Sequence, residues 1–206
     1  MSFRERHRYT HMTKIYTGAS MSLDGYISGP EESGFEYLFE WYGNGDVVVK
    51  TAMSDLTMSM TEMGAAHFRQ QIENAGALVV GRKLYDFTNA WGGRHPMDVP
   101  VVVLTHNPPG PDNDSFVFVT EGIEAAIEKA KELAGDKNVG LNSGQIASQA
   151  LQAKLIDEVW IDLVPVLLGG GTPFFSQFDG PVKLEGPLSI GDDKAVTHLR
   201  YRVRYA

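Results

Sequence analysis

The chain has 206 residues, and its 18 Lys and Arg residues against 26 Asp and Glu residues give a formal net charge of −8. Hydrophobic residues make up 43% of the chain, which is enough for a sizeable core, whereas the acidic balance argues against nucleic-acid binding because phosphate recognition needs a basic face. Cysteine is absent, which excludes disulfides, thiolate metal sites and cysteine nucleophiles and fits a reducing cytoplasm.

No apolar run reaches the ~18 residues of a membrane span, so we expect a soluble, cytoplasmic protein. Residues 1–12 hold Arg4, Arg6 and Arg8 but little apolar material. We expect a flexible N-terminal extension there, and the less favoured alternative is a basic binding arm. Residues 13–206 contain no internal repeat and no linker-like composition, which predicts a single domain.

The first half of this domain alternates short apolar runs with helical patterns. In chain order we expect a strand over 15–20, a Gly- and Pro-rich loop over 22–30, a short aromatic helix over 35–42, a helix over 65–74 that Gly76 ends, a strand over 77–81, a helix over 82–90 and a loop over 91–100. The Met- and Thr-rich stretch 51–63 has no clean period and receives no assignment.

The second half continues the alternation. We expect strands over 101–105, 116–119, 139–141 and 158–168, helices over 123–133 and 144–153, and two final strands over 182–188 and 196–205 with no helix between them. Strands that alternate with helices indicate crossover units and a mostly parallel sheet, and the last two strands indicate an antiparallel end. The sequence therefore predicts an α/β fold.

Three predicted strand ends lead into polar or Gly-rich turns, at Gly81-Arg82-Lys83, Thr105-His106-Asn107 and Asn142-Ser143-Gly144-Gln145. Ligands of open parallel sheets bind beyond the carboxyl ends of the strands, and helix N-termini attract phosphates. Arg82 and Lys83 place two positive charges in the first turn of a helix, which is favourable if they neutralise a bound anion. The equal alternative is a solvated pair. At the third turn the favoured alternative is that Ser143 simply caps the following helix.

Two loops carry further candidate residues. Asp24 follows the first strand and could orient an amide or serve a proton-transfer step, although Asp-Gly is also an ordinary turn pair and this alternative is favoured. Trp91 and His95 lie in a Gly- and Pro-rich loop that could wall a pocket for a flat ring. The equal alternative is that Trp91 covers the core.

Metal binding is not expected. His67 lies in a predicted helix and His198 in a terminal strand, and each is expected to be a surface or core histidine rather than a ligand. Within residues 13–206 no two histidines have the spacing of metal ligands on one helix, and the H-E-x-x-H motif is absent. Trp160 and Asp162 share one face of the long strand, where they contact either a partner subunit or a second layer of the same chain.

Several segments, taken in order, carry a family resemblance. They are Ser22-Leu23-Asp24-Gly25-Tyr26-Ile27, Val79-Val80-Gly81-Arg82, Val102-Val103-Leu104-Thr105, and Leu155-Ile156-Asp157-Glu158 running into Pro165-Val166-Leu167-Leu168-Gly169-Gly170-Gly171. Over about residues 14–206 the chain resembles the reductase domain of riboflavin biosynthesis, in the dihydrofolate-reductase-like superfamily, and the run 155–175 is the most specific part. The resemblance implies a three-layer α-β-α fold, an NADPH site across the carboxyl edge of the sheet, and a homodimer.

The resemblance also implies roles for individual residues. Gly81, Arg82 and Lys83 would hold the adenosine 2′-phosphate and pyrophosphate, and Thr105 and His106 would lie near the adenosine. The turn under the pyrophosphate would consist of Asn142, Ser143, Gly144, Gln145 and Ile146. Asp24 would lie near the nicotinamide and polarise or protonate the acceptor, whose pocket would be lined by Trp91 and His95.

Two departures from the family pattern bear on the substrate. The family's turn usually reads Gly-Gly followed by a small residue or proline, whereas this chain has Asn142-Ser143-Gly144. The riboflavin enzymes also carry a glutamate before the turn, where this chain has Leu141. The lack of cysteine also excludes the zinc deaminase half of the bifunctional enzyme.

The resemblance thus implies an NADPH-dependent reductase, similar to 5-amino-6-(5-phosphoribosylamino)uracil reductase, that passes a hydride to a small heterocyclic, imine or carbonyl acceptor. The alternative is a non-catalytic, NADPH-binding homo-oligomeric sensor or scaffold.

Overall fold

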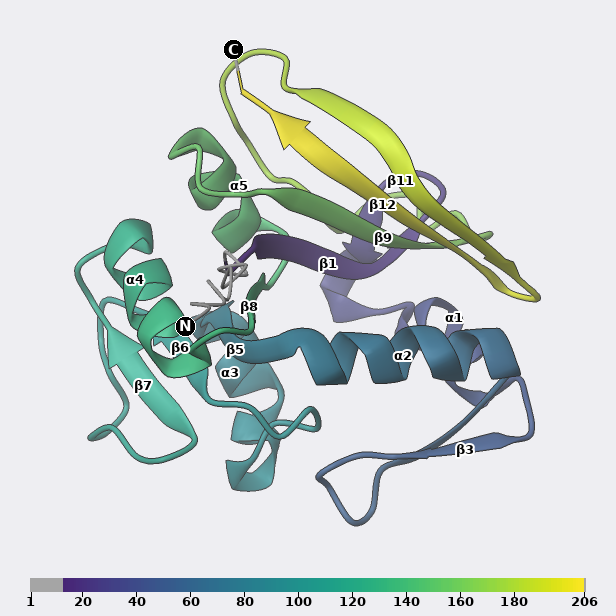
Figure 1. Cartoon of the computed structure of the whole chain (residues 1–206), viewed down its shortest axis with the longest axis horizontal. Helices are drawn as coiled ribbons and strands as arrows, with labels where there is room; N and C mark the ends of the chain where they lie inside the picture. The colour runs from purple at the N-terminus through teal and green to yellow at the C-terminus, as the bar shows by residue number, and fades with distance from the viewer. Residues whose placement is uncertain (1–12, 206) are drawn as a thin grey trace, which may run out of the picture.

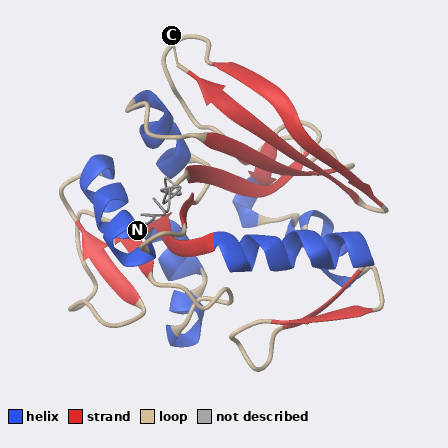
Figure 2. Ribbon diagram, viewed as in Figure 1, coloured by secondary structure: helices blue, strands red, loops and turns tan. Residues whose placement is uncertain are grey.

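The structure, a computed structural model, describes residues 13–205, so the extension expected over 1–12 lies outside the described residues. Its centre is an eight-stranded sheet with helices on both faces (Figure 1). The colouring of Figure 2 shows the three layers, with strands between two sets of helices. Among residues 13–205, no helix combines the length and apolar character needed to cross a membrane.

The central sheet confirms the predicted class, a mostly parallel sheet with an antiparallel C-terminal end. The spatial order is β11 (Lys183–Asp193), β12 (Val196–Arg204), β9 (Glu158–Val164), β1 (Ile15–Ser22), β8 (Asn138–Leu141), β5 (Ala75–Gly81), β6 (Val101–Leu104) and β7 (Phe116–Val119). All neighbouring strands from β9 to β7 pair in parallel, whereas β12 pairs antiparallel with both β9 and β11.

One face of the sheet, which we call the α5 face, is covered by α4 (Ile123–Ala134) and α5 (Gln145–Gln152). The apolar stripes of these helices pack on alternate residues of the strands, including the fully buried Val79, Val139 and Val159. Because successive residues of a strand point to opposite faces, the residues between these contribute to the other side of the sheet.

The opposite face, which we call the α2 face, is covered by α2 (Glu62–Asn74), α3 (Arg82–Phe87) and α1 (Phe35–Leu38) with the 3-10 turn that follows it. Trp41 from this turn is 1% exposed, and its Nε1 donates to Ser20 Oγ of β1 at 3.0 Å. Trp160 and Asp162 are buried on this face, where His67 of α2 contacts Asp162. A second layer of the same chain therefore covers them.

Two small strand pairs account for segments that the sequence did not assign correctly. The expected loop 22–30 contains β2 (Tyr26–Ser28), and the unassigned stretch 51–63 contains β4 (Thr57–Met60). Strands of three or four residues carry too little pattern, and the partner of β2 lies far along the chain. The bounds are β2 (Tyr26–Ser28), β10 (Thr172–Pro173), β3 (Val47–Lys50) and β4 (Thr57–Met60), and the 3-10 helices span Pro30–Glu32, Glu40–Gly43 and Asn89–Gly93.

The expectation that Gly76 ends the preceding helix is wrong. The helix α2 ends at Asn74 and the chain passes directly into β5, so that Gly76 is a strand residue. A Cβ at this position would lie 2.7 Å from the carbonyl oxygen of Ala134, at the end of α4. The glycine therefore serves a close approach between strand and helix rather than a helix terminus.

Several predicted boundaries also move. The helix expected over 82–90 ends at Phe87, because Asn89, Ala90 and Trp91 have φ angles of 49°, 52° and 48°, which no α-helix accommodates. The strand expected over 158–168 ends at Val164, which pairs with Ser22, the last residue of β1. Conversely, β11 runs five residues beyond the expected end at 188 because its hairpin with β12 continues to Asp193.

Candidate functional site

The carboxyl ends of the parallel strands form one edge of the sheet, which we call the carboxyl rim. Gly81 at the end of β5 pairs with Leu104 at the end of β6, and Leu141 at the end of β8 lies between Val79 and Thr17. The segments that follow β5, β6 and β8 therefore lie side by side on this edge, whereas β1 continues past Thr17 to Ser22, where it pairs with Val164 of β9. All the strand-end candidates singled out from the sequence lie here.

The turn after β8 is held tightly between two backbone segments. The amide of Asn142 donates to Val79 O at 2.9 Å, and the amide of Gly144 donates to Phe174 O at 2.7 Å. Gly144 has a φ of 78° and is the N-cap of α5, with no side chain capping the helix. The alternative that Ser143 caps the helix is wrong, because its buried Oγ instead lies 3.2 Å from Thr17 Oγ1.

No side chain accepts a hydrogen bond from the start of α5. The first amides of any helix, here those of Gln145 and Ile146, have no partner within the helix and carry its partial positive charge. Ile146 also packs beside Gly81, where an added Cβ would lie 3.5 Å from Ile146 Cγ1. This backbone arrangement fits a phosphate group between β5 and β8.

Arg82 and Lys83 lie at the rim, but each has a partner. Arg82 Nε donates to both carboxylate oxygens of Asp86, at 2.7 and 2.8 Å, and its Nη1 donates to the carbonyl of Asn107 in the loop after β6. Lys83 forms an ion pair with Glu32. Because exposed ion pairs contribute ~0–1 kcal/mol, a phosphate could replace either carboxylate at little expense.

Thr105 and His106 form the turn that follows β6. Thr105 is buried, its amide donates to Val119 O at 3.0 Å, and its Oγ1 accepts from the amide of Asn107 at 3.2 Å. His106 is exposed at the rim. The turn is thus fixed by the backbone, while the imidazole of His106 is available to a ligand.

Asp24 connects the end of β1 to the glycine-rich loop after β9 through hydrogen bonds. Its Oδ1 accepts from Ser22 Oγ at 2.6 Å and from the amide of Leu168 at 3.1 Å, and its Oδ2 accepts from the amide of Gly169 at 2.8 Å. The hydroxyl of Ser22, followed by these amides, holds the pKa of Asp24 below its ordinary value. The carboxylate is therefore ionised at neutral pH and is a poor proton donor.

Trp91 and His95 are not brought to the rim. The short helix α3 returns the chain to the amino edge of the sheet, where Trp91 stacks at 6.4 Å from the ring of Phe116, the first residue of β7. His95 lies 4.7 Å from Trp91, and burial lowers its pKa to about 4. Trp91 packs against a core cluster here, so the geometry does not bring these two residues to the acceptor pocket expected at the rim.

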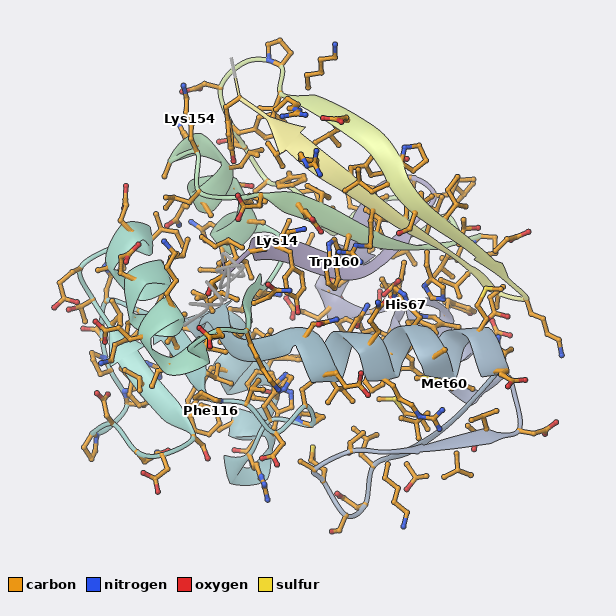
Figure 3. All side chains as sticks on the ribbon, viewed as in Figure 1. Lys14, Met60, His67, Phe116, Lys154 and Trp160 are labelled. Atoms are coloured by element: carbon orange, nitrogen blue, oxygen red, sulfur yellow. The ribbon has the colours of Figure 1, made fainter. Side chains whose placement is uncertain are left out.

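A second polar cluster, which sequence reasoning missed, lies on the α2 face. Asp162 Oδ1 lies 2.7 Å from His198 Nδ1 and 3.0 Å from His67 Nε2, and the two imidazoles stack with centroids 3.8 Å apart. Burial would raise the pKa of Asp162, but hydrogen bonds from both imidazoles outweigh it and hold the pKa below its ordinary value. Figure 3 shows His67 between α2 and the β11–β12 hairpin.

The ligating atoms of these three residues lie within 4.8 Å of one another, which raises the question of a metal ion. A metal lies in the plane of each imidazole that binds it, whereas two stacked rings with an interplanar angle of 19° direct their nitrogens side by side. The separations from the carboxylate oxygen are those of hydrogen bonds. The geometry fits one ionised carboxylate hydrogen-bonded to both imidazoles, with Gln71 Nε2 a further neighbour at 2.7 Å from His67 Nε2.

Glu158 forms a further buried charge network on the α2 face. It is 2% exposed and accepts from Lys14 Nζ at 2.6 Å, from Arg200 Nη2 at 2.7 Å and from Trp160 Nε1 at 2.9 Å. Burial would raise its pKa, but these donors hold the pKa at about 2. The alternating polar residues of β9, at 158 and 162, were the signal in the sequence that one face of this strand is not an ordinary core.

The chain is similar to known proteins over most of its length. The model of the RibD C-terminal domain family matches residues 13–193. The uncharacterized protein YwjB of Bacillus subtilis is 26% identical over 185 residues, which covers 88% of this chain and 94% of YwjB.

Three solved structures show the same fold. A protein from Shewanella sp. PV-4 assigned to riboflavin biosynthesis has a TM-score of 0.72 at 21% identity, covering 94% of this chain and all of that chain. A deaminase/5-amino-6-(5-phosphoribosylamino)uracil reductase from Thermotoga maritima has a TM-score of 0.61 at 13% identity, covering 93% of this chain and 57% of the other. Dihydrofolate reductase from Enterococcus faecalis, complexed with NADP(H), has a TM-score of 0.57 at 13% identity over 93% and 97% of the two chains.

These similarities confirm the resemblance that the strand-end segments carry in the sequence. The fold is that of the dihydrofolate reductases, and the family match extends from the start of the described residues into β11. This chain belongs to the RibD C-terminal domain family.

Proposed function

We propose that the protein is an NADPH-dependent reductase that transfers a hydride to a small heterocyclic, imine or carbonyl acceptor. The observation that carries the proposal is the uncapped start of α5, where the Gly144 turn follows β8 beside the end of β5. Membership of a reductase-domain family and the similarity of the fold to a dihydrofolate reductase complexed with NADP(H) support it. They also favour catalysis over the non-catalytic sensor.

The residues at the rim fit a dinucleotide phosphate. The strands β6, β5, β8 and β1 are neighbours in the sheet. Measured across the strands, they span about 14 Å, which is enough for an extended dinucleotide. In this arrangement Thr105 and His106 bind the adenosine, Arg82 and Lys83 bind the 2′-phosphate, and the turn of α5 binds the pyrophosphate through its amides. The turn comprises Asn142, Ser143, Gly144, Gln145 and Ile146.

The nicotinamide, when bound, supplies a hydride to the acceptor, and the chain must position both partners. Asp24 is a positioning residue in this proposal, because its ionised carboxylate ties the loop of Leu168 and Gly169 to the end of β1. It holds no proton to donate at neutral pH, so the acceptor takes its proton from water or from another group. This replaces the expectation that Asp24 protonates the acceptor.

The riboflavin intermediate 5-amino-6-(5-phosphoribosylamino)uracil is one acceptor to test. At the position of the glutamate found in the riboflavin enzymes, Leu141 is 3% exposed and packs in the core of the α5 face. A carboxylate that would contact that substrate is therefore replaced by an apolar core residue. We expect other small heterocycles or imines to be reduced faster than the riboflavin intermediate, as measured by NADPH oxidation with a panel of acceptors.

A homodimer is part of the same proposal. The edge strand β11 exposes Leu184, Leu188 and Ile190, which are 39%, 41% and 64% exposed. A second copy of the chain would cover these side chains and the edge of the sheet. Analytical ultracentrifugation should find a dimer that Ile190→Lys weakens; a monomer at all concentrations would contradict this part of the proposal.

The cofactor assignment is tested by comparing NADPH with NADH in two arginine variants. Arg82→Ala removes a guanidinium at the rim, and Arg94→Ala removes one with the same i,i+4 pairing, to Asp98, outside the rim. We expect Arg82→Ala to weaken NADPH about tenfold or more in calorimetric titrations, since charge-assisted bonds contribute about 1.5–3 kcal/mol, and to change NADH little. Arg94→Ala should change neither.

An equal loss of affinity for NADPH and NADH in Arg82→Ala would show that Arg82 does not bind the 2′-phosphate. If the wild-type protein binds neither dinucleotide, the reductase proposal itself fails.

A further inference from the structure

The two ends of the carboxyl rim differ in charge. The segments after β5 and β6 carry Arg82, Lys83 and His106. The segments after β1 and β9 lie within residues 22–49 and 155–182, and these ranges contain no Lys, Arg or His. We call this second end the acceptor end, because the proposed function places the hydride acceptor there. Residues 24–40 contribute five exposed or half-buried carboxylates to it, those of Asp24, Glu31, Glu32, Glu36 and Glu40.

The helix α1 is fixed to the acceptor end by a close contact. A Cβ on Gly34, the residue before the helix, would lie 2.7 Å from Leu168 Cδ2, so the two segments touch. The amide of Leu168 in turn donates to Asp24 Oδ1 at 3.1 Å. Phe35, the first residue of α1, therefore lies beside the loop that Asp24 holds.

Three phenylalanines form an aromatic wall between α1 and α3. The ring centroid of Phe35 lies 5.5 Å from that of Phe87, at the end of α3, and 5.9 Å from that of Phe39. Phe87 is 55% exposed and Phe39 is 40% exposed. About one turn before Phe87, Lys83 forms an ion pair with Glu32, which joins the two segments a second time. Exposed rings of this kind offer a surface on which a flat ligand can stack.

A phosphate group on the acceptor would be unfavourable at this end. Arg82 and Lys83 are the cations of the facing helix α3, and both are already paired with carboxylates. If the 2′-phosphate of the cofactor takes Lys83, as proposed above, Glu32 loses its partner and the negative charge of the acceptor end increases. A flat cation, in contrast, gains from these carboxylates and also from the faces of the aromatic wall.

A positively charged acceptor also fits the chemistry of Asp24, which is ionised and holds no proton to donate. When a hydride adds to the carbon of a C=N group with a positively charged nitrogen, it brings both electrons of the new C–H bond. The π pair of the C=N bond becomes the lone pair of the nitrogen, so the acceptor is reduced and becomes neutral, while the nicotinamide is oxidised and takes the positive charge. No proton is transferred in this step, and no proton donor is needed beside the acceptor.

We propose that the acceptor is a flat heterocycle that carries a positively charged C=N group and no phosphate, and that it lies against Phe35, Phe39 and Phe87 beside Asp24. The inference rests on the proposed function and narrows its substrate class. It disfavours 5-amino-6-(5-phosphoribosylamino)uracil because of the phosphate of that compound, a reason that is independent of Leu141.

Two flat bicyclic probes of similar size and opposite charge test the proposal, 1-methylquinolinium and 1-naphthyl phosphate. Their binding is followed by the amide chemical shifts of α1 and Phe87, in the protein saturated with NADP+ and again without it. We expect 1-methylquinolinium to bind at least about tenfold more tightly at low ionic strength, with a preference that shrinks as salt screens the exposed carboxylates. Equal binding, or tighter binding of 1-naphthyl phosphate, would overturn the proposal.

Paired variants assign the preference to the carboxylates of the acceptor end. Glu36→Gln combined with Glu40→Gln removes two exposed charges there and should reduce the preference for the cation at least about threefold. The control is Glu124→Gln combined with Glu128→Gln, which removes two exposed charges of the same spacing from α4 on the opposite face of the sheet and should leave the preference unchanged. An unchanged preference in the first pair would contradict the role of these carboxylates.

The aromatic wall is tested separately by Phe87→Leu. The loss of the ring should weaken both probes about two- to tenfold, since aromatic pairs contribute about 0.5–1.5 kcal/mol, and should leave their ratio unchanged. Phe178→Leu, at another exposed phenylalanine, is the control and should weaken neither. Unaltered binding of both probes in Phe87→Leu would remove the wall from the acceptor site.

The design separates this inference from the proposed function on which it rests. If NADP+ shifts no amides at residues 81–83 and 142–146, the proposed function fails, whereas the charge preference at α1 is still measured in the cofactor-free protein. If NADP+ binds there and the probes show no preference for the cation, the inference fails and the proposed function stands.

Discussion

The carboxyl rim and the α2 face use polar residues in opposite ways. At the rim, Arg82, Lys83 and Asp24 are partly or fully exposed, and the buried hydrogen bonds are made mainly by the backbone. On the α2 face, Glu158 and Asp162 are buried, and side chains from other elements neutralise them. At the rim, a side chain can exchange its partner while the backbone hydrogen bonds remain. On the α2 face, the buried carboxylates need each of their donors to stay neutralised.

The largest effect is expected from Glu158→Gln on the α2 face. The substitution leaves the charges of Lys14 and Arg200 without their buried carboxylate, and we expect the free energy of unfolding to fall by about 3 kcal/mol in urea denaturation. The matched control is Glu185→Gln on β11, an exposed partner of Arg202 and Arg204, which should change it by less than about 1 kcal/mol. Similar losses in both variants would show that the burial of Glu158 does not set its contribution to stability.

The same carboxylates should make the protein sensitive to acid. The pKa of Glu158 is about 2 in the folded protein against an ordinary value of 4.5, so the unfolded chain binds more protons between these pH values. The stabilisation is present above about pH 4.5 and is lost as the pH falls toward 2, and the lowered pKa of Asp162 acts in the same direction. Urea midpoints measured from pH 5 to pH 2 should fall more steeply for the wild type than for Glu158→Gln. Parallel curves would contradict the burial of this charge.

At the rim, Gly144→Ala should have a smaller effect on stability and a clear effect on binding. A side chain at a φ of 78° and a ψ of −130° is strained by about 1–3 kcal/mol, and the amides at the start of α5 would shift. We expect this loss in urea denaturation, together with weaker NADPH binding in calorimetry. Gly110→Ala, at a loop position with open space around the added Cβ, is the control and should change neither. Unchanged NADPH affinity in Gly144→Ala would remove this turn from the cofactor site.

The smallest effect is expected from Asp24→Asn, because Asp24 is exposed. An amide group cannot accept from Ser22, Leu168 and Gly169 at once, so the loop after β9 should open more often. We expect faster hydrogen exchange at the amides of Leu168 and Gly169, with the amides of β5 and the melting temperature unchanged. Unaltered exchange at both loop amides would show that Asp24 does not hold the loop.

The difference between the regions also explains what the sequence could predict. Each rim segment is local: the apolar run before Gly81 and the helix after it are neighbours in the chain, so their order and class indicate where the strand ends meet. The same holds for the turn at Gly144. What could not be predicted was that Arg82 and Lys83 already have partners, because Asn107 and Glu32 belong to other segments.

The α2 face could not be predicted for the same reason. His67, Asp162 and His198 come from α2, β9 and β12, and neither period nor spacing in the chain relates them. The predicted placement of Trp91 and His95 at the rim was wrong, because a Gly- and Pro-rich loop indicates a turn but not the edge of the sheet to which the chain returns. Only the pairing of distant strands supplies that information.

Chemical-shift mapping of amides during a titration with NADPH tests the central claim most directly. The shifts should concentrate at residues 81–83, 105–106 and 142–146, where the ends of β5, β6 and β8 meet. Saturable shifts at all three segments would support a dinucleotide across the rim. A titration with no shifts there, or with shifts restricted to the α2 face, would contradict it.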